Sequence, residues 1–276
     1  MPAEENSRWD DWTHLDAPEA AAAAVAKLET LGRSAAEVSA REHYLNLLDI
    51  RPGQAVIDVG AGTGIAALEM ATRVGRSGRV VAIDPSERLG SHAREAAARA
   101  GAGDVVAWWT GRAESLPFPD GAFDRSFCHW LLLHVDDAEA VVREMRRVTR
   151  PGGRLMGVEV DWETVTVHPG ERTLTRRILN FSSDRHIEGW SGRRLAPLFR
   201  DCGIAEVFVE PVVTVDEGFD GPQWVRFLHQ RAEMALAASV VGDAEASEWL
   251  DAIDRAVTRR RYFFSVTQFV VWGDVS

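Results

Sequence analysis

Short apolar runs alternate with amphipathic stretches through the middle of the chain, and this pattern predicts strands that alternate with helices. The runs lie at residues 55–59, 79–83, 105–109, 123–128 and 154–160. The intervening stretches end near Val74, Gly101 and Pro151 and carry apolar residues at helical spacing, as Val141, Met145 and Val148 do. Such alternation indicates βαβ units around a parallel sheet, with helices on both faces.

The flanking segments complete this picture. Helices are expected at 17–31 and 35–49. Residues 161–203 and 219–258 are expected to be mostly helical and irregular. Two more strands are expected at 204–209 and 263–272. The sequence therefore predicts an α/β fold with a doubly wound, mostly parallel seven-stranded sheet. Its organisation is an N-terminal helical lid at 1–50 and a Rossmann-like domain at 51–276, with a helical insertion on the substrate side at about 161–203.

Composition and charge narrow the classes of function. The chain has 276 residues and a net charge of −11, which argues against nucleic acid and an anionic membrane as partners. The apolar run at 20–26 is too short to span a bilayer. Cys128 and Cys202 cannot form a disulfide framework or a zinc site alone, and no other metal-ligand spacing stands out, so a cytoplasmic protein without a metal is expected. A homodimer is left open.

The turn after the first strand carries the clearest chemistry. Asp58 precedes Gly60, Ala61, Gly62, Thr63 and Gly64, and three glycines let the backbone pass close to a ligand at the start of a helix. A nicotinamide-binding turn would place its third glycine later, where Ile65 stands, and Asp58 would repel a pyrophosphate. A ligand with a cationic end suits the turn better. Asp84 ends the second strand and either accepts the hydroxyls of a ribose or caps the following helix.

Three segments of the sequence resemble class I S-adenosylmethionine-dependent methyltransferases, in particular the quinone-methylase-like group that acts on small molecules. They are Val56–Gly64, Ala113–Asp124 and Arg147–Leu155. The resemblance implies that the cofactor S-adenosylmethionine lies on the glycine turn, that Asp84 holds its ribose, and that Ala113 and Glu114 lie by the adenine. Pro85, Cys128 and His129 complete the expected cofactor contacts. Many relatives have Asp or Asn where this chain has Arg112, which leaves the contact to the adenine amino group to Glu114 or to backbone.

Candidate groups for catalysis and substrate binding follow the later strands. His129 is expected near the cofactor sulfonium, and the candidates for a general base are His129, Asp161 and His186. Carboxylates, histidines and aromatic rings around the same pocket favour an aromatic or heteroaromatic substrate, with cation–π attraction as a further role. The expected substrate contacts are Tyr44, Trp130, His134, Glu159, Trp162 and Trp190. His134 has a purely structural role as its alternative.

The resemblance therefore predicts methyl transfer to a small molecule. Carbon or nitrogen methylation of a ring is favoured, as in specialised metabolism, and an indole is one candidate acceptor. The alternatives are an O-methyltransferase and a non-catalytic module that binds S-adenosylmethionine, because a fold does not determine function. A nicotinamide-dependent reductase is disfavoured by Ile65.

Overall fold

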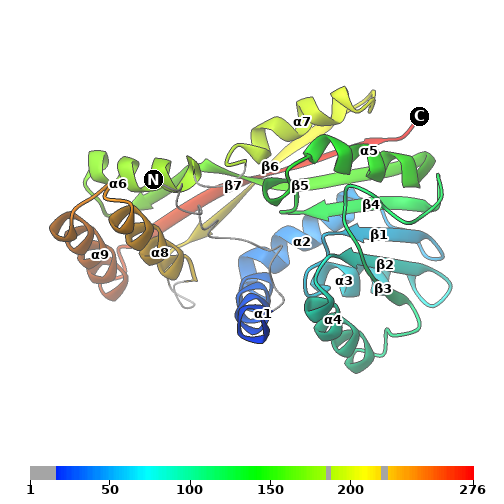
Figure 1. The fold of residues 1–276 in the computed structure, drawn as a ribbon, viewed down its shortest axis with the longest axis horizontal. Helices are drawn as coiled ribbons and strands as arrows, with labels where there is room; N and C mark the ends of the chain where they lie inside the picture. Colours follow the sequence, from blue (N-terminus) through cyan, green and yellow to red (C-terminus); the bar gives the residue numbers. More distant parts are fainter. Residues whose placement is uncertain (1–16, 185–187, 219–222) are drawn as a thin grey trace, which may run out of the picture.

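A seven-stranded sheet organises the protein. The computed structural model describes residues 17–184, 188–218 and 223–276, and its strand order is β3-β2-β1-β4-β5-β7-β6 (Figure 1). The strands are β1 (Ala55–Val59), β2 (Arg79–Asp84), β3 (Val106–Thr110), β4 (Phe123–His129), β5 (Thr149–His168), β6 (Phe208–Asp216) and β7 (Phe263–Asp274). The first five strands run parallel, whereas β7 is antiparallel to β5 and β6. The predicted doubly wound, mostly parallel seven-stranded sheet is confirmed.

The helices begin where polar side chains cap them. Ser34, Ser86 and Asp137 each accept a hydrogen bond from the backbone N–H three residues later, which satisfies a free donor of the first helical turn. The helices are α1 (Pro18–Gly32), α2 (Ala35–Leu47), α3 (Ile65–Val74), α4 (Glu87–Arg99), α5 (Ala138–Val148), α6 (Arg172–Asp184), α7 (Ser191–Asp201), α8 (Gln223–Ala237) and α9 (Asp243–Thr258), with a short 3-10 helix, η1 (Leu132–His134).

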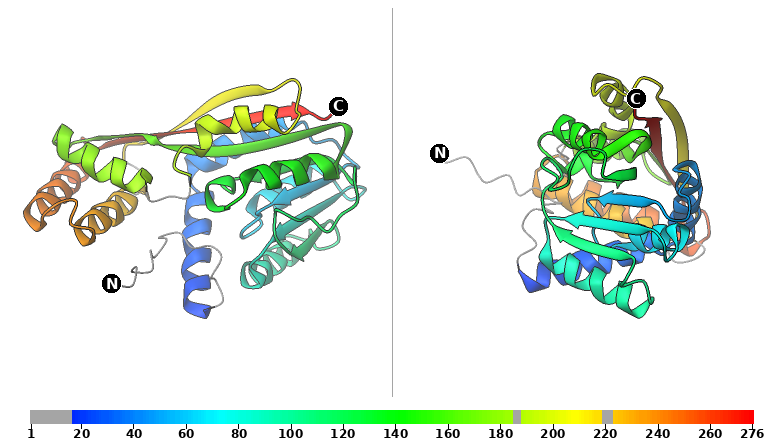
Figure 2. Two further views of the ribbon diagram at one scale, coloured as in Figure 1. Left: turned by 45° about the horizontal axis from the view of Figure 1, so that its top comes forward. Right: turned by 90° about the vertical axis from the view of Figure 1, so that its right-hand side faces the viewer.

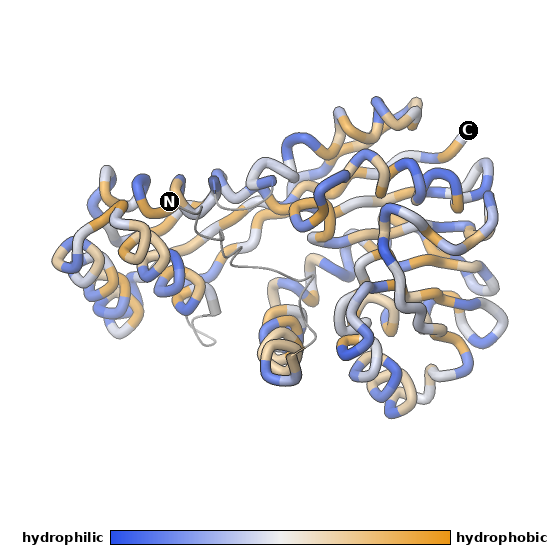
Figure 3. The backbone as a smooth tube through the Cα atoms, viewed as in Figure 1, coloured by the Kyte–Doolittle hydropathy of each residue, from blue (hydrophilic) through white to orange (hydrophobic). Residues whose placement is uncertain are grey.

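Successive residues of the central strands enter two different apolar cores, because side chains of a strand alternate between its faces. Val56 packs with residues of α2 and α3, whereas Ile57 packs with residues of α5 and α7. In Figure 3 the central strands are mostly orange, whereas the helices alternate between blue and orange, as expected where one face of a helix is buried. The carboxyl ends of β1, β2 and β4 therefore lie at one edge, between two layers of helices.

A third core begins just beyond the end of β4, where Leu133 and Trp130 contribute to it. The long strands β5 and β7 extend beyond the parallel part of the sheet, and α6, α8 and α9 gather at their far end (Figures 1 and 2). We call these three helices, with residues 160–168 and 262–266, the distal lobe. Its core contains Val160, Trp162, Ile178, Leu228, Trp249, Ile253 and Phe264.

Two strand boundaries differ from the expectation. The fifth strand was expected to end at residue 160, but β5 continues to His168 and pairs with β7 as far as Phe263. The segment Val165-Thr166-Val167 is β-branched and favours a strand. The sixth strand is Phe208–Asp216 instead of residues 204–209, and it includes Pro211 because an edge strand tolerates a missing N–H donor. Among the helices of the described residues, none is both long and apolar enough to cross a membrane.

Candidate functional site

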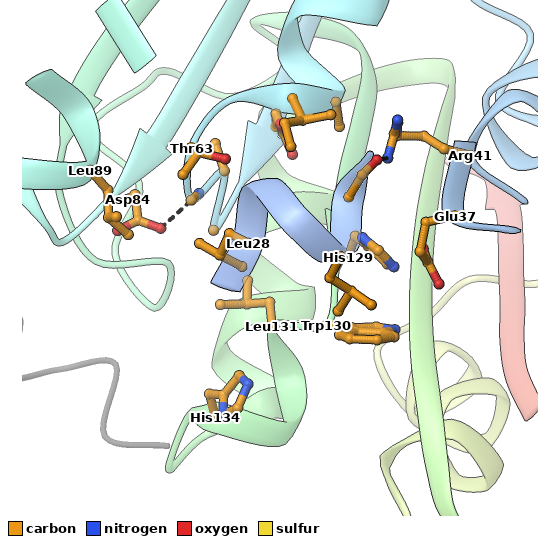
Figure 4. A pocket seen from close by; sticks show the side chains of 18 of the residues that line it. Leu28, Glu37, Arg41, Thr63, Asp84, Leu89, His129, Trp130, Leu131 and His134 are labelled. Carbon is orange, nitrogen blue, oxygen red and sulfur yellow. Dashed lines mark hydrogen bonds between the residues drawn. The ribbon is translucent and has the colours of Figure 1, made fainter. Parts of the chain in front are cut away.

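A cavity of about 210 Å³ lies at the carboxyl ends of β1, β2 and β4 (Figure 4). Ten of the residues singled out in the sequence line it, namely Asp58, Gly60, Ala61, Gly62, Thr63, Asp84, Pro85, His129, Trp130 and His134. The wall also contains Leu28, Leu31 and Gly32 from α1, and Glu37 and Arg41 from α2. The fold thus brings together residues from the glycine turn, from two neighbouring strand ends and from the N-terminal helices.

The glycine turn can take its shape only without side chains. Gly60 has a φ of 73°, and a Cβ there would lie 2.8 Å from the Leu131 side chain. Gly64 has a φ of 78° and immediately precedes α3, so the first N–H groups of that helix follow a left-handed residue. Backbone N–H groups are therefore available at the cavity wall, where a ligand can approach them closely.

Two buried carboxylates lie side by side at this end of the cavity. Asp84 accepts hydrogen bonds from the backbone N–H groups of Gly62 (3.0 Å) and Ser86 (3.0 Å), while Ser86 itself caps α4. Burial raises the pKa of Asp84 against the effect of those two donors. Burial and the Asp84 carboxylate raise the pKa of Asp58 to about 7. Among the described residues, Asp58 Oδ2 has no hydrogen-bond partner, although it is buried.

These features fit a ligand that carries hydroxyl groups and a positive charge. An unpaired buried carboxylate oxygen is costly unless a ligand supplies a donor or a cation. Asp84 supplies acceptors at the second strand end, where the capping role is already taken by Ser86. In the part of the chain that the structure describes, His, Cys, Asp and Glu side chains form no cluster that could hold a metal ion.

The opposite end of the cavity is formed by His129, Trp130, Glu37 and Arg41 (Figure 4). Burial lowers the pKa of His129 to about 4, so its ring is neutral near neutral pH. Trp130 has a φ of 51°, which is uncommon for a residue with a side chain, and its indole N–H donates to Gln268 (3.0 Å). The short turn after β4 thus presents an imidazole and an indole to the cavity.

The helix α1 covers the cavity from the N-terminal side. Leu28 lies close enough to the glycine turn that a Cβ at Gly62 would approach it to 3.3 Å. Arg41 holds the junction of α1 and α2 in place, since its guanidinium donates to the Gly32 carbonyl (2.8 Å) and to Glu69 on α3 (2.8 Å). The N-terminal helices are therefore part of the cavity wall, and Arg41 brings a buried positive charge to it.

Four predicted substrate contacts lie elsewhere and are corrected here. Tyr44 is fully buried beneath the cavity and stacks on Phe127 at 5.6 Å. Trp162 belongs to the core of the distal lobe, where it stacks on Phe227 at 5.1 Å. Trp190 is partly exposed and lies under two arginine side chains. None of these three rings lines the described cavity.

Glu159, the fourth, supports the cavity without lining it. Its carboxylate accepts hydrogen bonds from the backbone N–H groups of Leu131 (2.9 Å) and Leu132 (2.7 Å), and from the Ser191 hydroxyl (2.9 Å). Burial raises the pKa of Glu159 to about 7 against these donors. Glu159 thus fixes the turn that carries His129 and Trp130. This role depends on which loop lies over the end of β5, and no pattern in the sequence indicates it.

Of the two candidate bases that the structure describes, His129 lines the cavity and Asp161 does not. Asp161 is buried in an ion pair with Arg193 on α7 (2.8 Å), which corrects its predicted catalytic role. His186 falls outside the described residues.

Four expected cofactor contacts, Gly64, Ala113, Glu114 and Cys128, do not line the described cavity. Ala113 and Cys128 belong to the core beneath α5, where burial raises the pKa of the Cys128 thiol. Glu114 pairs with Arg112 at 2.7 Å. The adenine contact by Ala113 and Glu114 therefore stays a prediction.

Comparisons with known proteins agree with this geometry. Residues 57–157 match the model of a methyltransferase domain. The chain is 32% identical over 248 residues to an uncharacterised protein of a Streptomyces fradiae transposon, covering 90% of this chain and 70% of that protein. It is 28% identical to a demethylmenaquinone methyltransferase of Desulfitobacterium hafniense, covering 60% of this chain and 72% of that enzyme. The chain belongs to the class I S-adenosylmethionine-dependent methyltransferases.

Further similar proteins include an enzyme that matches a smaller part of the chain and two solved structures that match most of it. A ubiquinone/menaquinone biosynthesis C-methyltransferase of Hahella chejuensis is 38% identical, but over only 40% of this chain and 44% of that enzyme. Among solved structures, the YcgJ protein of Bacillus subtilis has a TM-score of 0.56 at 21% identity, and the alignment covers 85% of this chain and 97% of that one. A geranyl diphosphate C-methyltransferase of Streptomyces coelicolor has a TM-score of 0.55 at 16% identity, covering 87% and 76%. These two structures share the fold.

The methyltransferase uses S-adenosylmethionine as its cofactor and acts on a small molecule. The cavity wall described above suits that cofactor. The two buried carboxylates can accept hydrogen bonds from its hydroxyl groups and balance its positive charge, and the glycine turn lets it approach the backbone. The sequence reasoning did not identify Leu28, Leu31, Glu37 or Gln268 as site residues. A helix that precedes the first strand carries no sign of which strand end it will cover.

Proposed function

We propose that this methyltransferase transfers the methyl group to a ring carbon or ring nitrogen of a small aromatic or heteroaromatic molecule, as in specialised metabolism. The observation that carries the proposal is the composition of the cavity end opposite Asp84. There, Trp130 and Leu131 from the turn after β4 lie beside Leu31 of α1 and Arg41 of α2. The indole and the leucine side chains offer apolar contacts that favour an aromatic ring over a sugar or a peptide, and the polar groups beside them, His129, Glu37 and Arg41, can orient that ring.

The names of the relatives support carbon as the acceptor atom. Two of the similar proteins are a demethylmenaquinone methyltransferase and a C-methyltransferase of ubiquinone and menaquinone biosynthesis, and a solved structure of the same fold is a geranyl diphosphate C-methyltransferase. The fold alone carries less weight, because a [4+2]-cyclase shares it at a TM-score of 0.52 and 22% identity. An indole ring is one acceptor that would fit beside Trp130.

Residues of this chain have defined tasks in such a reaction. When bound, the cofactor supplies a methyl group on a positively charged sulfur. Asp84 would accept hydrogen bonds from the ribose hydroxyls. Leu28 and Leu31 of α1 would exclude water from the cavity. The turn held by Glu159 would align Trp130 with the acceptor ring. Positioning and exclusion of water are the main contributions expected of the protein in such a displacement.

The test is transfer of an isotope-labelled methyl group to a panel of acceptors, with cofactor affinity measured by calorimetry. The panel contains indoles, quinols, phenols and heteroaromatic amines, and mass spectrometry with NMR locates the label. Label on a ring carbon or nitrogen is the expected result. Label on oxygen would make the protein an O-methyltransferase. Binding of the cofactor without transfer to any acceptor would favour the non-catalytic module and contradict the proposal.

A further inference from the structure

A buried chain of polar side chains connects the N-terminal helices to the cavity through the last strand. Gln268 of β7 donates from Nε2 to Glu37 Oε1 of α2 (2.8 Å). Its Oε1 lies 3.0 Å from Trp130 Nε1 and 3.2 Å from His129 Nε2, both at the end of β4. Gln268 is fully buried, and Glu37 is 2% exposed. Three segments far apart in the sequence thus meet at one amide group.

The partners of Gln268 determine its orientation. A carboxylate accepts hydrogen bonds, so the amide NH₂ must point to Glu37. The Trp130 indole can only donate, so the amide oxygen must point to the turn after β4. His129 therefore donates from Nε2 to the same oxygen and is the Nε2–H tautomer. Its Nε2 lone pair is not available, and its low pKa makes the remaining nitrogen a weak base.

Glu37 differs from the other carboxylates in the wall of the cavity. Asp58 and Asp84 lie at the cofactor end, whereas Glu37 lies beside His129 and Trp130 (Figure 4). Arg41 is one helical turn away, but its guanidinium is bound to Glu69 and Gly32. Within the described part of the chain, the hydrogen bonds to the Glu37 carboxyl group end on Oε1, and Oε2 remains as an acceptor. A buried carboxyl group held by one amide, without a bonded cation, is well placed to take up a proton.

We propose that Glu37 accepts the proton that the acceptor molecule loses on methylation, and that Gln268 positions it for this step. The proposal rests on the proposed function. In the overall change, an electron pair of the acceptor forms the new bond to the methyl carbon. The bond between sulfur and that carbon breaks and leaves its electron pair on sulfur. The bond from the acceptor atom to hydrogen returns its electrons to the ring, and the proton moves to the Glu37 carboxylate, which becomes neutral.

The surroundings of Glu37 match this task. The charged or titratable groups around it are Arg41 and Tyr44 on its own helix, Glu69 on α3 behind Arg41, and His129 on β4. Gln268 of β7, which donates to Glu37, is uncharged, as is Thr214 of β6, which accepts from the same amide nitrogen (3.4 Å). Burial raises the pKa of Glu37 to about 7, against the Gln268 hydrogen bond and the Arg41 charge. A general base works best when its pKa lies near the working pH.

The decisive variant is Glu37→Gln, which keeps an oxygen for the Gln268 hydrogen bond but cannot take up a proton. The expected result is a fall in kcat of roughly 10²–10⁴-fold with calorimetric cofactor affinity changed less than about twofold. A readout independent of turnover is the infrared difference between the wild type and the variant. One protonated-carboxyl band that titrates near neutral pH should be lost, while the bands of Asp58 and Glu159 remain. Glu87→Gln is the matched control, since Glu87 also lies in the first turn of a serine-capped helix but is exposed.

Gln268→Met tests the positioning role. Loss of the amide donor should raise the pKa of Glu37 and shift the pH profile of kcat to higher pH. The variant Glu37→Asp keeps a carboxylate and should therefore retain part of the rate that Glu37→Gln loses. An undiminished rate in Glu37→Gln, with transfer by the wild type, would overturn the proposal for Glu37 alone. Parallel loss of rate and cofactor affinity would make Glu37 a cofactor contact and also overturn it. A wild type that transfers no methyl group contradicts the proposed function, and this proposal with it.

Discussion

The two ends of the molecule bury opposite kinds of side chain. At the cofactor end, the strand ends carry Asp58 and Asp84 into a cavity, and burial raises the pKa of both. In the distal lobe, the same sheet carries aromatic rings, and Phe264 stacks on Trp224 with 4.8 Å between ring centroids. One end thus keeps costly polar groups that a ligand can satisfy, and the other gains stability from apolar burial.

This difference suggests that one end of β5 and β7 supports cofactor binding and the other end contributes stability. The distal lobe has its own core, and none of the residues described at the cavity wall comes from α6, α8 or α9, although Leu31 and Trp130 of that wall pack against the core. The stability that the lobe adds can therefore be separated from cofactor binding, whereas a change near β4 should affect both. The predictions below test this separation, beginning with the largest effect.

Phe264→Ala should lower the free energy of unfolding by about 3–5 kcal/mol, because it removes a fully buried ring from the distal core. Cofactor affinity, measured by calorimetry under conditions in which the variant is folded, should not change. Phe127→Ala is the matched comparison, because Phe127 is equally buried but lies 6.4 Å from His129 between ring centroids. It should weaken both stability and affinity. If Phe264→Ala lost affinity as well, the two regions would be coupled.

The same two regions differ in how far the sequence predicts them. The sequence predicts the strands of the cofactor end to within one or two residues. Three of them, β1, β2 and β3, are short apolar runs that end at an aspartate or directly before a glycine. The third strand was expected at residues 105–109 and lies at Val106–Thr110. The carboxyl-end rule also predicts that Asp58, Asp84 and His129 lie together, and all three line the cavity.

The distal lobe and the acceptor end of the cavity could not be predicted in this way. The extension of β5 is stabilised by pairing with β7, about a hundred residues away, and its own residues are mixed polar and apolar. Glu37 follows Ser34 by three residues and looks like an ordinary acid in the first turn of a capped helix. Gln268 looks like a polar residue of a surface strand. Only the tertiary fold shows that they meet.

Glu159→Gln should reduce the dependence of stability on pH. Burial raises the pKa of Glu159 from its ordinary 4.5 to about 7, so the folded state binds its proton more tightly than the unfolded state does. The contribution of this group is fully present below about pH 4.5 and is lost as the pH rises to about 7. The wild type should therefore lose up to roughly 3 kcal/mol more stability than the variant across that range. Denaturant unfolding at several pH values measures the difference, and parallel curves would contradict the assignment.

Asp84→Ala should weaken binding of S-adenosylmethionine by about 1.5–3 kcal/mol, the usual value of a hydrogen bond to a charged group. Its carboxylate also orders the glycine turn through the Gly62 N–H, so part of the loss reflects that turn. Calorimetry gives the affinity, and the stability of the cofactor-free protein serves as the control. That stability should not fall by a comparable amount, because removing Asp84 also relieves its repulsion of Asp58. An unchanged affinity would remove Asp84 from the cofactor site.

The smallest effect is expected where α1 meets α4. His92 Nε2 lies 3.4 Å from Glu29 Oε1, and both side chains are partly exposed. This pair connects the helix that covers the cavity to the helix that follows Asp84. His92→Ala should change stability by less than about 1 kcal/mol, as is usual for such pairs. Because α1 forms part of the cavity wall, cofactor dissociation should nevertheless become up to about fivefold faster, which stopped-flow tryptophan fluorescence can follow. The Glu95 and Arg99 pair lies within α4 alone, so Glu95→Gln should leave the rate unchanged.

At about 1 M salt, where such pairs are screened, His92→Ala and the wild type should release the cofactor at the same rate. A difference that persists there would mean that His92 acts through packing and not through charge.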